Sequence, residues 1–86
     1  MIGTVDFNMI VEINRLLKQE EYDYTVHSIG GCASCGLSLR CDGKETDLNE
    51  VMTIINRYLK TKWLKAIPNI EDPYTLGIVS TFKSLL

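Results

Sequence analysis

The chain has 86 residues and a formal net charge of −2, which is enough for one small globular domain and not for two. Its slightly acidic balance argues against a nucleic-acid partner, because such modules usually carry a basic surface. No apolar stretch reaches the roughly 18 residues of a membrane span, and the N-terminus lacks the basic start of a secretory signal. We therefore expect a cytoplasmic protein with no membrane partner, whose three cysteines stay reduced.

The first predicted element is a helix over residues 6–20. Its apolar residues Ile10, Ile13 and Leu17 recur at helical spacing, and Asp6 is suited to cap its N-terminus. Two segments that alternate apolar and polar residues follow, YDYTVHSI and GLSLRC, and a loop rich in glycine and cysteine separates them. This pattern predicts a β-hairpin.

The hairpin register predicts which side chains share a face. With the loop centred on Ala33, Tyr24 pairs with Cys41 and Val26 pairs with Leu39. Alternation then places these four side chains, with that of Leu37, on the core side. The opposite face carries a polar set, which is a candidate interaction face: Thr25, His27, Ser38 and Arg40.

The second half of the chain predicts another helix, over residues 48–61, followed by two more strands. Asp47 can cap this helix, and Glu50 stands three residues later, as in a capping box. The segments KWLKAI and YTLGIVS are the strands. The dipeptide Asp72-Pro73 could instead start a C-terminal helix, but the Thr, Ile and Val residues that follow favour a strand.

The two halves resemble each other in sequence. DFNMIVEINRLLK aligns with DLNEVMTIINRYLK after one insertion, and both helices end on Asn-Arg-x-Leu-Lys. Residues 5–41 and 46–80 therefore suggest a repeated αββ unit within a single domain, 1–86, although amphipathic helices also look alike by chance. The predicted fold is α+β, in the order α-β-β-α-β-β, with both helices on one face of a four-stranded antiparallel sheet. The other face is then solvated or used in pairing.

The segment GGCASCG, residues 30–36, holds the most specific chemical signal. Cys32 and Cys35 lie between glycines Gly30, Gly31 and Gly36, and Cys-x-x-Cys-Gly between two strands resembles the knuckle of zinc ribbons and rubredoxin-like proteins. That resemblance implies metal-binding thiolates, with zinc as the candidate cofactor. Zinc ribbons carry a second such pair, which this chain lacks, so a four-cysteine site would need a homodimer.

Two other interpretations of the thiols stay open. A redox pair is less favoured, because no helix follows the cysteines to lower a thiol pKa, and both thiols could also have no chemical role. Cys41 lies on the order of 17 Å along the strand from Cys35, so we expect an inert core cysteine there. His27, the only histidine, could contribute a ligand or be a half-exposed strand residue without a role.

A basic stretch, KTKWLK, surrounds the only tryptophan, Trp63. Lysines around an aromatic residue can bind nucleic acid. We favour the alternative that they protect an edge strand from pairing and that Trp63 packs at the rim of the core.

The functional expectation is a small binding module rather than an enzyme, because the sequence has no nucleophile set with an oxyanion hole, no P-loop and no dinucleotide motif. In the leading hypothesis the dithiol holds a metal or a thiophilic partner, and a homodimer could share that ligand. The alternatives are a protein-interaction domain that uses the polar face and a thiol redox protein.

Overall fold

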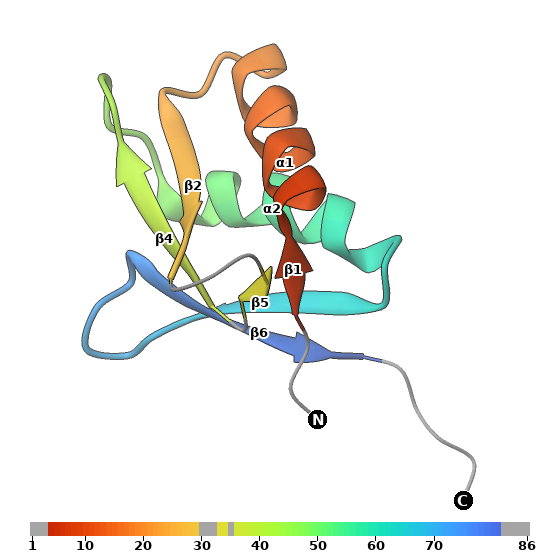
Figure 1. Ribbon diagram of the computed structural model, residues 1–86. Coiled ribbons are helices and arrows are strands. Elements are labelled where there is room, and N and C mark those ends of the chain that lie inside the picture. The colour runs from red at the N-terminus through yellow and green to blue at the C-terminus, as the bar shows by residue number, and fades with distance from the viewer. Residues whose placement is uncertain (1–3, 30–32, 35, 82–86) are drawn as a thin grey trace, which may run out of the picture.

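The structure is a computed structural model that describes residues 4–29, 33–34 and 36–81. Four strands form an antiparallel sheet in the order β2-β4-β6-β5, and β1 pairs separately with β3. Both helices pack on the same face of the sheet (Figure 1), which confirms the predicted α+β architecture. The elements in chain order are β1 (Val5–Asp6), α1 (Phe7–Gln19), β2 (Tyr24–Ser28), β3 (Ala33–Ser34), β4 (Gly36–Cys41), α2 (Leu48–Lys60), β5 (Leu64–Pro68) and β6 (Thr75–Ser80).

Both helices begin at the aspartates that the sequence predicts as caps. The carboxylate of Asp6 accepts a hydrogen bond from the amide of Met9 at 2.9 Å, and that of Asp47 accepts from Asn49 at 2.9 Å. These bonds satisfy amides of the first helical turn, which have no partner within the helix.

Both helices are followed by a residue with left-handed backbone. Glu21 has φ 66° and Trp63 has φ 60°, and they are the two non-glycine residues with positive φ in the described part of the chain. After α1, the amide of Tyr22 donates to the carbonyl of Leu17 and that of Glu21 donates to Lys18. This is a Schellman ending, in which the left-handed position is usually glycine.

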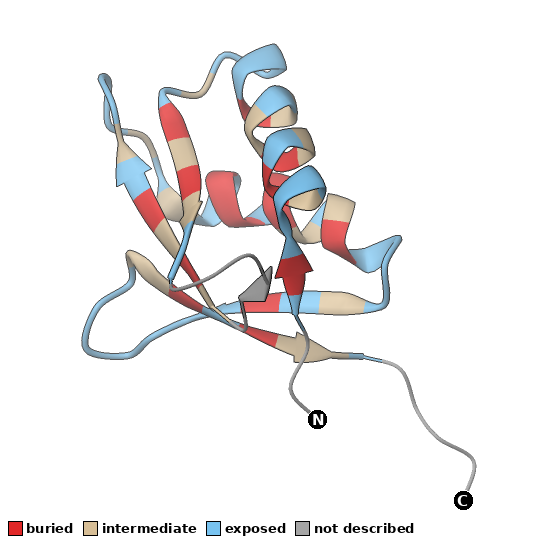
Figure 2. Ribbon diagram, viewed as in Figure 1, coloured by how far each residue is buried: buried red, intermediate tan, exposed pale blue. Residues whose placement is uncertain are grey.

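The register of the first hairpin is the predicted one. Tyr24 pairs with Cys41 and Val26 with Leu39, and buried residues alternate with less buried ones along β2 and β4 (Figure 2). The C-terminal segment is a strand, β6, as favoured. The carboxylate of Asp72 accepts from the hydroxyl of Thr75 at 2.9 Å, so Asp72-Pro73 forms a turn that leads into β6 and does not start a helix.

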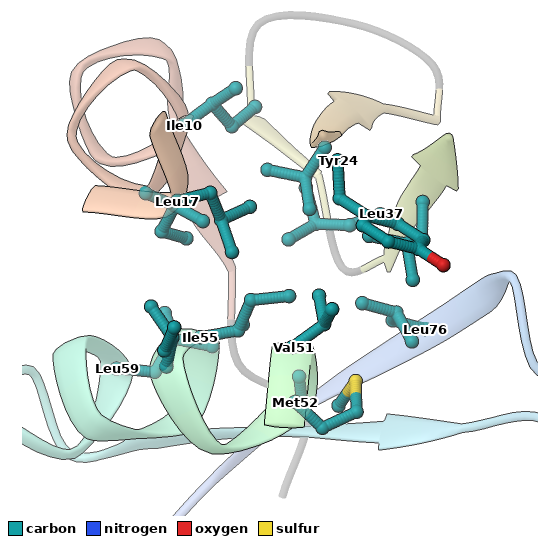
Figure 3. Packing of buried hydrophobic residues seen from close by; sticks show 14 of the residues in the cluster. Ile10, Leu17, Tyr24, Leu37, Val51, Met52, Ile55, Leu59 and Leu76 are labelled. Carbon is teal, nitrogen blue, oxygen red and sulfur yellow. The ribbon is translucent and has the colours of Figure 1, made fainter. Parts of the chain in front are cut away.

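The centre of the core lies where the two hairpins meet. Leu37 of β4 pairs with Leu76 of β6, and the two side chains are 0% and 1% exposed. Figure 3 shows both pointing into the cluster that α2 completes with Val51 and Ile55. Buried leucines at this junction join the two halves into one core.

The two hairpins are paired alike. Leu37 lies opposite Ser28, the last residue of β2, and Leu76 lies opposite Pro68, the last residue of β5. The two leucines thus hold equivalent positions and also pair with each other, as a local two-fold relation requires. The repeat of one αββ unit over residues 5–41 and 46–80 stays a prediction.

Candidate functional site

The predicted dithiol lies outside the described residues, together with two of its glycines: Cys32, Cys35, Gly30 and Gly31. The two residues between the cysteines are described. Ala33 pairs with Asp6, and Ser34 pairs with Val5, as the short strand β3. The resemblance to a zinc knuckle implies a tight turn at these positions, so their extended pairing lends that resemblance no support. The sequence gives no signal for β1, because Val5 is an isolated apolar residue.

The polar set lies together on the sheet face opposite the helices. Thr25 pairs with Arg40 and His27 with Ser38, as the predicted alternation requires. Arg40 is exposed and the other three are half-buried. No group of three or more His, Cys, Asp or Glu side chains suited to a metal ion occurs within the described ranges.

A hydrogen-bonded chain links three members of this face. The hydroxyl of Thr25 donates to Oδ2 of Asp42 at 2.6 Å, and it lies 2.9 Å from Nε2 of His27. A threonine hydroxyl has one hydrogen, so with that hydrogen given to Asp42 it accepts from Nε2–H of the histidine. Asp42 is thus part of this hydrogen-bonded chain. The hairpin pattern does not predict its place there, because Asp42 follows the last residue of β4.

Cys41 lies at the end of the hairpin remote from the dithiol segment. It pairs with Tyr24, the first residue of β2, and it packs half-buried against the core. Its thiol donates to the carbonyl of Gly43 at 3.4 Å. The expected core location therefore holds in part, since the thiol lies at the edge of the core and not inside it.

An apolar groove runs across the same open face beside the polar set. It has a volume of about 780 Å³, and its floor is the pairing of Gly36 with Gly77. Ile67 and Val79 line it from β5 and β6, and Ile67 is 46% exposed. A Cβ on Gly36 would lie 3.1 Å from the carbonyl oxygen of Leu76, so close strand packing favours glycine there. The groove depends on which strands pair and in what register. The pattern of a single strand does not contain that information, so the sequence alone does not predict the groove.

Asparagine side chains close both edges of the sheet. Asn14 of α1 accepts from the amide of Val26 at 2.7 Å and donates to its carbonyl at 3.1 Å. Asn56 of α2 binds both backbone groups of Ala66, at 2.7 and 3.3 Å. The strands concerned, β2 and β5, are the two edges. Because unpaired edge groups are the template for strand addition, these side chains occupy one position on each edge that an added strand would use.

Trp63 does not pack at the rim of the core, contrary to expectation, because its side chain is 61% exposed. It follows α2 at the left-handed position described above. The adjoining strand β5 is an edge strand, as the lysines suggest.

Several tyrosines around the core have raised pKa values. Burial is the main cause for Tyr22, Tyr58 and Tyr74, because it disfavours the charged phenolate. Negative neighbours add to the effect, with Glu12 and Asp6 acting on Tyr58. All three side chains pack against the core, which accounts for these shifts.

Comparison with protein-family models, with characterised proteins and with solved structures finds no match for this chain. Neither described helix has the length and apolar character that crossing a membrane requires.

Proposed function

We propose that this protein is a small non-enzymatic binding module that associates with a second copy of itself through the open face of its sheet. The observation that carries the proposal is the apolar groove, where Ile67 and Val79 flank the facing glycines. No helix or strand of the described chain covers this face (Figure 1). Apolar surface left exposed on a small protein commonly marks an interaction site.

The two edges support a face-to-face arrangement over strand addition. The backbone groups of Val26 and Ala66 are already bound by Asn14 and Asn56, so a strand added at either edge would have to displace the asparagine side chain there. A second sheet that packs on the open face needs no free backbone group, because packed sheets lie about 10 Å apart and contact each other through their side chains.

A second copy suits this face because a two-fold interface must complement itself. The groove is apolar and can meet an identical groove. Beside it, Arg40 carries a positive charge and Asp42 a negative one, and Asp42 reaches the face through its bond to Thr25. A two-fold rotation can bring the arginine of one copy to the aspartate of the other. We expect these charged residues to determine how the two copies are oriented more than how tightly they bind.

Zinc binding by the dithiol is a second candidate, since Ile29 and Gly36, which flank that segment, line the groove. A dimer carries four such thiols, and four thiolates suit zinc. Native mass spectrometry of protein purified without chelator measures this separately. We expect one zinc per dimer in the native chain and none after Cys32→Ser; a metal-free dimer would reject the zinc site and keep the interface.

Sedimentation equilibrium tests the interface. Ile67→Asp places a charge in the groove, and Val11→Asp places the same charge on α1, away from the open face. The two side chains are matched, at 46% and 47% exposure. We expect a dimer for the native chain and for Val11→Asp, and a monomer for Ile67→Asp. A monomeric native chain at every concentration, or equal weakening by both substitutions, would reject the proposal.

A further inference from the structure

The segment between Glu50 and Glu71 concentrates positive charge in an acidic protein. It has no acidic residue and four of the nine cations. Arg57 forms an ion pair with Glu20 at 2.9 Å. The three others are exposed and form no ion pair with the described residues: Lys60, Lys62 and Lys65. Together with Trp63 they are called the basic corner below.

The structure gathers these residues around one bend. Lys60 ends α2, Lys62 and Trp63 lie in the turn, and Lys65 lies on β5. Lys60 and Lys65 also line a common cavity of about 290 Å³, with Thr81 and Asn56 and without any acidic side chain. The two lysines are exposed and carry like charges that repel each other, and an anionic group such as a phosphate would relieve that repulsion.

The aromatic side chain adds a second contact of a different kind. The indole of Trp63 is 61% exposed and belongs to the same bend. Glu21 has the same left-handed backbone after α1, so this conformation is common to both helix ends. The exposed indole distinguishes the second bend from the first. Bases of single strands stack on such aromatic faces while lysines bind their phosphates.

We propose that the basic corner binds single-stranded nucleic acid, with Trp63 stacked on a base and its three lysines bound to phosphates. An anionic membrane is the other partner for lysines beside a tryptophan. It is less suited here, because Leu64 is half-buried and no second exposed apolar side chain lies between residues 60 and 65 to enter a bilayer.

Trp63 is the only tryptophan, so its fluorescence reports binding without a label. The full chain is titrated with an oligothymidylate of about ten nucleotides, within the usual range of such sites, at several salt concentrations. We expect saturable quenching and a slope of about −2 for log affinity against log salt, because each phosphate contact contributes about −0.7. Absence of saturable quenching at low salt would overturn the proposal.

Matched variants locate the site. Lys60→Gln combined with Lys65→Gln removes two charges from the corner, and Lys18→Gln combined with Lys44→Gln removes two exposed charges elsewhere. We expect the first pair to reduce the slope to about −0.7 and the second to leave it unchanged. Equal effects of the two pairs would reject a defined site in favour of general charge attraction.

The aromatic contact needs a labelled oligothymidylate followed by anisotropy. We expect Trp63→Ala to weaken binding about tenfold or more and Trp63→Phe to retain most of it, because any aromatic face can stack. Anionic vesicles that shift Trp63 emission to the blue, with no response to the oligonucleotide, would assign the corner to membranes and overturn the proposal.

Discussion

Asn14 and Val26 form a closed pair, in which one side-chain amide binds both the N–H and the C=O of one residue on an edge strand. Asn56 forms the same pair with Ala66 on the opposite edge. Each asparagine takes the place of a neighbouring strand at one position. The helices of this domain therefore do more than cover the core, since each also closes the edge of the strand that follows it.

Replacing Asn14 with alanine leaves the amide and carbonyl of Val26 without a protein partner. Leaving half-buried hydrogen-bonding groups without a partner costs about 1–3 kcal/mol. We therefore expect Asn14→Ala to lower the free energy of unfolding by that amount. Asn56→Ala should cost a similar amount. Urea unfolding measures both, with Asn8→Ala on the exposed side of α1 as the control. A cost for Asn14→Ala no larger than that of the control would contradict this role.

The junction of the two hairpins predicts a symmetric mutational effect. Leu37 and Leu76 are fully buried and face each other, so replacing either with alanine opens a cavity at a cost of about 2–5 kcal/mol. If the two sites are equivalent, the costs measured by urea unfolding agree within about 1 kcal/mol. Ile70→Ala, at a side chain 99% exposed, should have almost no effect. A large inequality between the two leucines would argue against the local two-fold relation.

The end of α1 offers a stabilising change. Glu21 holds a left-handed conformation that costs an L-residue about 1–2 kcal/mol relative to glycine. We expect Glu21→Gly to raise the midpoint of thermal unfolding. Gln19→Gly, at the last residue of α1, should lower it, because glycine is the poorer helix former by up to about 1 kcal/mol. Opposite signs at these neighbouring positions would support the Schellman ending, and a lower midpoint for both would refute it.

Much of the fold is predictable from local patterns. The spacing of Ile10, Ile13 and Leu17 specifies the buried side of α1, and alternation around Val26 specifies the faces of the first hairpin. These patterns work because burial selects side chains with the period of the backbone. The pairing of Leu37 with Leu76, which fixes the strand order, joins residues far apart in the sequence and has no local signal.

The candidate site is less predictable for the same reason. The sequence identifies Thr25, His27, Ser38 and Arg40 as one face, and the register bears that arrangement out. The edge-closing role of Asn14 requires knowledge of where α1 lies over β2, which periodicity does not contain. The expectation that Trp63 packs at the rim of the core was wrong. An apolar residue in a strand-like segment suggests burial, whereas the position of Trp63 in the bend leaves its side chain exposed.

Stability should decline in alkaline solution. The folded pKa of Tyr58 is raised above its ordinary value of about 10, first by burial and then by Glu12 and Asp6. Its contribution is fully present below that ordinary value and is lost as pH rises through the higher folded pKa, because the unfolded chain releases the phenol proton more readily. Tyr58→Phe should flatten this decline, and absorbance titration should show one fewer late-ionising phenol. Ionisation of Tyr58 at its ordinary pKa would contradict its burial.

Intermolecular contacts across the open face test the central claim most directly. A sample that mixes isotope-labelled and unlabelled chains reports, in a filtered nuclear Overhauser experiment, only the contacts between copies. We predict signals from the methyl groups of Ile67 and Val79 and none from Val11 on α1. Intermolecular signals confined to Val11, or none at concentrations where the chain sediments as a dimer, would show that this face is not where two copies meet.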